Sequence, residues 1–301
     1  MNSYSVSYKK LWKLMIDRGL KKGQLRIATG MSKGTLAKLG KDEIVSLNVL
    51  LSVCEYLGCD FCDIMEVAPA SQQEVPYYMA YELRYQKLLA AGAPCWADMS
   101  NDEILTNALS RWVTENNLKG KRIIEYACGE GVCGTILTKL GCRYHGVDVA
   151  PSAVKRAAAA LREYPAATVS LLDMVEERVN DEYDAALDVM GLQMLVADRD
   201  RRKYLENVMA SLKAGAHALF FRESFREDAY DGVIQSFHDW KKRNNDLIDL
   251  QQIPVRAKSK AGYMAELEAV GFDVDDFVCM DINMQQSYSA SIYVHKPGRL
   301  F

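Results

Sequence analysis

The first 65 residues combine short apolar clusters with turn-forming residues. Apolar side chains recur three or four positions apart through residues 47–57, and Gly58 follows directly. This spacing places them on one face of a helix, and a glycine after such a run favours its end. The pattern predicts four short helices, the first capped by Ser7 and the others over residues 23–29, 32–39 and 46–57.

Beyond Lys121 the pattern changes to short apolar runs that alternate with helical segments. Such alternation favours a mostly parallel, doubly wound sheet with helices on both faces, which is an α/β fold. Past Glu223 we expect a long helical region, a turn at residues 271–272 and two more strands. The seven predicted strands read RIIEYA, CRYHGVDV, ATVSLLD, YDAALDVM, HALFFRE, DVDDFVCM and YSASIYVH.

The stretch between these two patterns reads as a linker followed by helices. Residues 68–76, APASQQEVP, lose the apolar periodicity and gain Pro, Ser and Gln. Four tyrosines between residues 77 and 85 then fall at helical spacing, and Ser100 with Glu103 has the spacing of a capping box. We predict a small all-α domain over residues 1–66, a linker over 67–76 and an α/β domain over 77–301.

Composition is that of a globular protein, with 49% hydrophobic residues in a chain of 301. No apolar run approaches the roughly 18 residues that cross a bilayer, so we expect a cytoplasmic protein. The net charge of -3 conceals a split. Residues 1–50 hold ten Lys or Arg against three Asp or Glu, a balance of +7, and the rest holds 27 against 37, a balance of -10. A basic head indicates an anionic partner for that part alone.

Eight cysteines are scattered along the chain. Cys59 and Cys62 form a CxxC pair with Cys54 nearby, which is half of a zinc-site pattern. No second pair of Cys or His stands at suitable spacing, so the prediction is reduced thiols and no metal.

The central motif is a glycine-rich turn between an apolar strand and a helix. Residues 125–134 read EYACGEGVCG, and Gly129 and Gly131 let the backbone pass close to a ligand beside a helix N-terminus. About 15 residues later a second strand ends at Asp148, where a carboxylate suits a ribose diol. Because Gly129, Gly131 and Gly134 also spell GxGxxG, a nicotinamide or flavin domain is the first alternative.

Three neighbouring features favour another family. Glu125 opens the motif, LLDM ends the third strand, and SLKAGAHALFFRE leads into the fifth. This arrangement resembles the class I S-adenosylmethionine-dependent methyltransferases over almost all of residues 77–301. The resemblance implies a Rossmann-like, seven-stranded sheet, and the last two strands resemble that family's antiparallel end.

The resemblance implies S-adenosylmethionine as the cofactor and assigns its contacts by motif position. The glycine turn holds the methionine half, the acid after the second strand the ribose, and the acid after the third strand the adenine. In the family an N-terminal helix often closes over the cofactor, and an aromatic face suits a sulfonium cation. The cofactor contacts predicted on this basis are Glu125, Gly129, Gly131, Asp148, Asp173, Met174, Asp188 and Tyr81.

The methyl acceptor is predicted from the residues after the fourth strand. Residues 188–191 read DVMG, whereas amino-methylating DNA enzymes have Asp or Asn, two prolines and an aromatic there. The single Pro-Cys, at residues 94–95, precedes the glycine turn, so cytosine methylation is disfavoured too. We therefore expect a small molecule or, second, a peptide. A base is optional when the sulfonium is already activated; the candidates are His238 and Glu223.

The N-terminal part resembles the repressor and Cro family of helix-turn-helix domains, with residues 30–32 as the turn. That resemblance makes residues 32–41 the recognition helix and its end, and directs Lys33, Thr35 and Lys38 toward duplex DNA. Arg26 departs from the pattern, because the family usually has alanine there. The domain is therefore expected either to bind DNA or to mediate dimerisation or docking, and a homodimer is one expected assembly.

Three functions follow from these patterns. The first is a methyltransferase acting on a small molecule; the second is a transcriptional regulator whose methyltransferase-like body senses S-adenosylmethionine or another ligand without turnover. The third, a nicotinamide oxidoreductase, rests on the glycines alone. Formation of S-adenosylhomocysteine, a DNA complex without turnover, or a co-purified dinucleotide distinguishes them.

Overall fold

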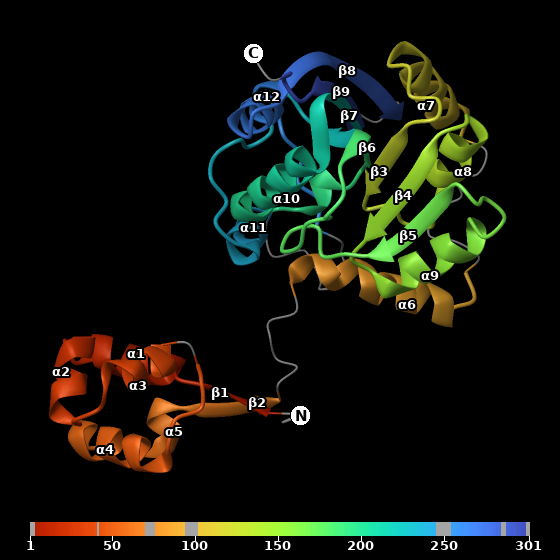
Figure 1. The fold of residues 1–301 in the computed structure, drawn as a ribbon. Helices are drawn as coiled ribbons and strands as arrows, with labels where there is room; N and C mark the ends of the chain where they lie inside the picture. The colour runs from red at the N-terminus through yellow and green to blue at the C-terminus, as the bar shows by residue number, and fades with distance from the viewer. Residues whose placement is uncertain are drawn as a thin grey trace. The chain divides into compact units, whose positions relative to one another are not determined.

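The computed structural model describes residues 4–40, 42–69, 76–93, 102–244, 254–283 and 287–298. The chain divides into two compact units, Met1–Val75 and Pro76–Phe301, and Figure 1 shows the elements of each. Among the described residues, no helix combines the length and apolarity needed to cross a membrane.

The N-terminal unit is a helical bundle around one apolar core. Leu11, Leu25, Leu39, Val53 and Ile64 are fully buried in it. The four predicted helices are present, and Gly58 ends the fourth in a left-handed conformation (φ 54°). Its helices are α1 (Lys9–Asp17), α2 (Lys22–Ala28), α3 (Lys33–Gly40), α4 (Leu47–Leu57) and α5 (Phe61–Ile64).

A two-stranded ribbon closes this unit and was not predicted. Strand β1 (Tyr4–Ser7) pairs antiparallel with β2 (Glu66–Pro69). Residues 67–69 of the predicted linker therefore belong to β2, and residues 70–75 of it lie outside the described residues. The two segments are only four residues long and far apart in sequence, so neither carries a readable period.

The second unit contains the predicted seven-stranded sheet, in the order β5-β4-β3-β6-β7-β9-β8 (Figure 1). The first five strands in that order are parallel, and β9 runs antiparallel to both β7 and β8. The antiparallel end is thus confirmed. Its strands are β3 (Arg122–Tyr126), β4 (Arg143–Asp148), β5 (Ala167–Leu171), β6 (Tyr183–Val189), β7 (Leu212–Phe225), β8 (Asp273–Asn283) and β9 (Ser287–His295).

Helices cover both faces of the sheet and bury two apolar cores. One core includes Trp112 and Leu137, and the other Tyr204 and Leu267. The helical elements are η1 (Tyr77–Met79), α6 (Ala80–Ala90), α7 (Glu103–Glu115), α8 (Val132–Lys139), α9 (Pro151–Ala160), η2 (Leu192–Met194), α10 (Asp198–Ser211), α11 (Phe237–Arg243) and α12 (Lys260–Ala269).

Three local predictions differ from the structure. Helix α1 begins after Tyr8, which makes no side-chain cap, and the predicted cap Ser7 ends strand β1. The cap of α7 is Asp102, which accepts a hydrogen bond from Leu105 N at 2.9 Å; Ser100 lies outside the described residues. The long helix expected past Glu223 is wrong, since residues 226–236 contain no helix. In this stretch a backbone N–H group bonds to a side chain and not to a helical carbonyl group: Asp198 Oδ2 accepts a hydrogen bond from Ile234 N at 2.5 Å.

Candidate functional site

A cavity opens at the carboxyl ends of the parallel strands of the second unit. It is lined by the turn after β3, the ends of β4 and β6, the loop after β5, and tyrosines of η1 and α6. This edge is where open α/β sheets bind ligands. Of the predicted cofactor contacts, the cavity brings together Glu125, Gly129, Asp148, Met174 and Tyr81.

The two turn glycines have different environments. Gly129 is left-handed (φ 53°) and faces the cavity, where a Cβ would lie 3.3 Å from the Tyr85 hydroxyl. Gly131 (φ 82°) faces helix α9, and a Cβ there would lie 3.1 Å from the Ala157 Cβ. Its N–H donates to Cys128 O at 3.0 Å. Gly129 thus borders the cavity, whereas Gly131 permits the close approach of α9.

The third glycine of the motif makes room for a tyrosine that holds Glu125. A Cβ on Gly134 would lie 2.6 Å from the Tyr144 ring, and one on Gly146 2.5 Å from its hydroxyl. That hydroxyl donates to Glu125 Oε2 at 2.5 Å. Burial raises the pKa of Glu125 to about 8, and the hydrogen bond from Tyr144 opposes this shift.

Asp148 joins the glycine turn to the end of β4. Its carboxylate accepts from Gly129 N at 2.9 Å and from Ala150 N at 2.8 Å. Burial raises its pKa to about 6, while the two backbone donors favour the ionised form. The group is therefore ionised at pH 7, with capacity for further hydrogen-bond donors.

Met174 lines the cavity, but its neighbour Asp173 does not. Asp173 accepts from Tyr78 OH at 3.0 Å and from Val175 N at 3.0 Å. It therefore caps the turn after β5 and fixes the Tyr78 ring, which does line the cavity.

Helix α6, which contributes Tyr81 and Tyr85 to the cavity wall, is held by hydrogen bonds to two other segments. Tyr81 OH donates to Pro254 O at 3.0 Å. Glu82, on the same helix, accepts from Ser152 N at 3.0 Å and from Ser152 Oγ at 2.8 Å. The contact between Glu82 and Ser152 was not predicted, because nothing in the sequence around Glu82 indicates a partner 70 positions away.

The other residues of the second unit that were predicted to bind the cofactor or act as a base, Asp188, Glu223 and His238, do not line the cavity. Asp188 is buried and accepts from Gly191 N and from the Tyr204 hydroxyl. Glu223 is 0% exposed, its Oε2 accepts from Gln193 N at 2.7 Å, and burial beside Asp188 raises its pKa. His238 is exposed on α11.

The part of the cavity wall formed by Met190, Met194 and Leu195 was not predicted from the sequence. Met190 is a non-glycine residue with φ 63°, a strained conformation that clusters at functional sites. Only the DVMG sequence itself could have directed attention there. Of the described residues, no group of three or more His, Cys, Asp or Glu side chains is arranged to hold a metal ion.

The predicted recognition helix is α3 of the N-terminal unit. Lys33 and Lys38 are exposed on it, whereas Thr35 is half-buried. Ser32 Oγ accepts from Thr35 N at 3.0 Å and lies 2.9 Å from Thr35 Oγ1. Thr35 thus forms part of the helix cap, and the two lysines present free charge to solvent.

Comparisons with known proteins agree with both units. A Cro/C1-type HTH DNA-binding domain model matches residues 10–70, and a methyltransferase domain model matches residues 124–218. The transcriptional regulator VanUg is 64% identical over 23% of this chain and 92% of its own, with a TM-score of 0.23.

Similarity to known methyltransferases is more distant. The ribosomal protein L11 methyltransferase of Psychrobacter arcticus is 46% identical over 44 residues, so this chain matches only 14% of that relative's length. The 1,6-didemethyltoxoflavin-N1-methyltransferase of Burkholderia thailandensis shares the fold, with a TM-score of 0.55 and 15% identity over 73% of this chain and 89% of its own. The chain therefore combines a region that matches a Cro/C1-type helix-turn-helix model with a region that matches a methyltransferase domain model, and the second unit has the fold of a methyltransferase.

Proposed function

We propose that this protein transfers a methyl group from S-adenosylmethionine to a small molecule, and that its N-terminal domain binds duplex DNA as a dimer. The observation that carries the first part is one cavity lined by Gly129, Asp148 and Met174 at the carboxyl edge of the parallel strands. Gly129 lies in the turn after β3, Asp148 at the end of β4 and Met174 in the loop after β5, and these three strands are neighbours in the sheet. Together they fit the amino-acid, ribose and adenine parts of one extended nucleoside.

Each part of the cofactor has a chemically suited partner. Gly129 leaves room for the amino-acid part, and Glu125 lies beneath that turn. The ionised Asp148 accepts the ribose hydroxyls, while Met174 packs on the adenine. Tyr81 offers an aromatic face to the sulfonium. Gly131, Asp173 and Asp188 act through the turns they stabilise.

The remaining wall faces the methyl acceptor. Tyr81, Val189, Met190, Met194 and Leu195 line it, and none of them is charged. An acceptor with an apolar or aromatic surface fits such a wall better than a nucleic-acid backbone does. Neither His238 nor Glu223 borders the cavity, so methyl transfer rests on positioning for in-line displacement.

The second candidate function is a regulator that binds the cofactor without turnover. Two observations favour it: neither His238 nor Glu223 borders the cavity, where a catalytic base would act, and the chain carries a region that matches a helix-turn-helix model. A nicotinamide oxidoreductase is disfavoured, because the antiparallel β9 and β8 end the sheet.

Methyl transfer is testable without knowing the acceptor. The full chain, incubated with methyl-labelled S-adenosylmethionine and the small-molecule fraction of a cell extract, should form S-adenosylhomocysteine and one labelled product by mass spectrometry. The control is Asp148→Ala, which removes the ribose partner. Cofactor binding by calorimetry without any product would favour the regulator instead.

The two turn glycines should respond differently to substitution. Gly129→Asn keeps a tolerated left-handed backbone but fills the cavity, so the cofactor Kd should rise at least about tenfold with little change in Tm. Gly131→Ala should instead cost about 1–3 kcal/mol of stability, because its Cβ meets α9 at positive φ. Calorimetry and thermal unfolding measure both. Unaltered affinity in folded Gly129→Asn would contradict the assignment.

Cofactor affinity should depend on the ionisation of Asp148. Because its raised pKa is about 6, the ribose-binding carboxylate takes up a proton as the pH falls through that value. The fraction ionised drops about tenfold between pH 7 and pH 5, and the apparent affinity should drop with it. Asp148→Asn should bind weakly with a flat profile over this range. A flat profile for the unaltered protein would exclude Asp148 from ribose binding.

DNA binding is testable by its dependence on salt. We expect a gel-shift complex whose affinity falls with salt, with a slope shallower by about 1 for each of Lys33→Gln and Lys38→Gln. Lys13→Gln, an exposed change on α1, is the control. If no complex forms at low salt with a broad pool of sequences, the domain serves for dimerisation or docking, and the mass in solution then distinguishes these two.

A further inference from the structure

The acceptor side of the cavity is formed by an irregular segment, residues 191–197. Met194 and Leu195 line the cavity, and the short η2 turn is its only regular element. It follows the left-handed Met190 directly. A segment of this kind makes few backbone hydrogen bonds of its own, so other groups must hold it in one conformation.

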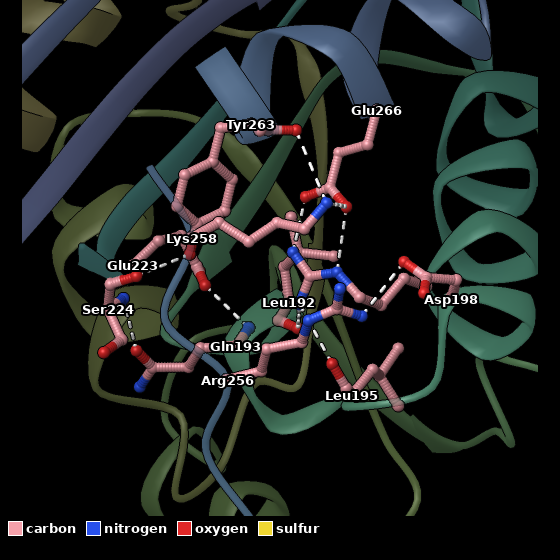
Figure 2. A network of polar contacts seen from close by, with 12 residues as sticks. Leu192, Gln193, Leu195, Asp198, Glu223, Ser224, Arg256, Lys258, Tyr263 and Glu266 are labelled. Atoms are coloured by element: carbon pink, nitrogen blue, oxygen red, sulfur yellow. Dashed lines mark hydrogen bonds and ion pairs between the residues drawn. The ribbon is translucent and has the colours of Figure 1, made fainter. Parts of the chain in front are cut away.

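A buried arginine holds the carbonyl groups of this segment. Arg201 Nη1 donates to Leu192 O at 2.7 Å and to Leu195 O at 2.9 Å (Figure 2). Glu266 of α12 holds the guanidinium in turn, with Nε–Oε2 at 2.9 Å and Nη2–Oε1 at 2.5 Å. Arg201 is 1% exposed. The Arg201 donors that reach Leu192 and Leu195 are therefore fixed in direction.

Two further buried side chains hold the middle of the segment. Glu223 Oε2 accepts from Gln193 N at 2.7 Å, and Arg256 N donates to Gln193 O at 2.8 Å. Arg256 Nη1 also donates to Val196 O at 2.9 Å. Figure 2 shows these groups converging on the segment from β7 and from the stretch before α12.

Fold stability alone is a poor reason for this network. Buried ion pairs pay a large desolvation cost, and apolar side chains of equal volume often stabilise as well or better. Within the described part of the chain, Glu223 Oε1 and Arg256 Nε have no hydrogen-bond partner. A network with such costs fits a requirement for one defined conformation of the segment it holds.

We propose that Arg201 is a positioning residue, which through Leu192 and Leu195 sets the cavity wall that selects the methyl acceptor. Glu266 orients Arg201, and Glu223 holds the neighbouring Gln193. This inference rests on the proposed function, in which that wall faces the acceptor. The acceptor class it implies is a small molecule that presents an uncharged, apolar or aromatic face to Met194 and Leu195.

The first test measures the wall directly in the full chain by NMR of 13C-methyl methionine. The Met194 signal is assigned by its loss in Met194→Leu. It should shift or broaden in Arg201→Lys, which keeps the charge but not the forked geometry, and in Glu266→Gln. The Met174 signal should stay in place. Arg202→Lys is the matched control, since its side chain is exposed on the same helix.

The second test measures selection of the acceptor, with a cell's small-molecule extract and labelled cofactor as the probe. Arg201→Lys should lower the transfer rate at least about tenfold in dilute extract and recover to within about threefold in concentrated extract, with the cofactor Kd nearly unchanged. This pattern is a change of KM, which general loosening of the fold does not produce.

Two results would overturn the inference: an unmoved Met194 signal in both variants, or a shift of all methionine signals together with loss of cofactor binding. If the unaltered protein transfers no methyl group, the proposed function fails. The NMR result then still decides whether Arg201 positions the wall.

Discussion

Close approach of backbone segments around the glycine turn is the constraint on which the site depends. The Tyr144 ring fits where it does only because Gly134 and Gly146 lack a Cβ. Helix α9 approaches the turn only because Gly131 also lacks one. With those segments packed, Gly129 N lies 2.9 Å from Asp148. The cavity is therefore produced by packing, and its ligand-facing groups are held in place before any ligand arrives.

Four neighbouring strands each carry a buried carboxyl group near the carboxyl end of the strand. Glu125, Asp148, Asp188 and Glu223 all have raised pKa values because burial disfavours their charged forms. At least one oxygen of each accepts a hydrogen bond from a backbone N–H or a hydroxyl. For Asp148, Asp188 and Glu223 the donor is a backbone N–H of the turn after β3 or of the segment after β6, whereas Glu125 accepts from the Tyr144 hydroxyl. The same kind of contact thus fixes the turn after β3 and the segment after β6.

The two domains differ in charge and in the kind of surface each offers. The first 50 residues carry a balance of +7, and exposed lysines stand on α3. The body is acidic overall and hides its functional groups in a cavity. The first helical elements of the second unit, η1 and α6, contribute Tyr78, Tyr81 and Tyr85 to that cavity.

The sequence by itself determined the α/β class, the seven strands, the glycine turn and the helix-turn-helix, because each depends on residues near one another in the chain. Periodicity, turn chemistry and motif spacing are local signals. Tertiary structure alone decided that Gly131 faces α9, that Glu82 binds Ser152, and that β1 pairs with β2.

The same limit applies to the segment of residues 191–197, which forms part of the cavity wall. Arg201 meets Glu266 across 65 positions, and Glu223 meets Gln193 across 30. Such pairs leave no period in the sequence, since nothing in either residue alone indicates its distant partner. Only packing of α10, α12 and β7 around one segment brings them together. The sequence therefore determined which fold carries the cavity, and tertiary packing decided which side chains shape it.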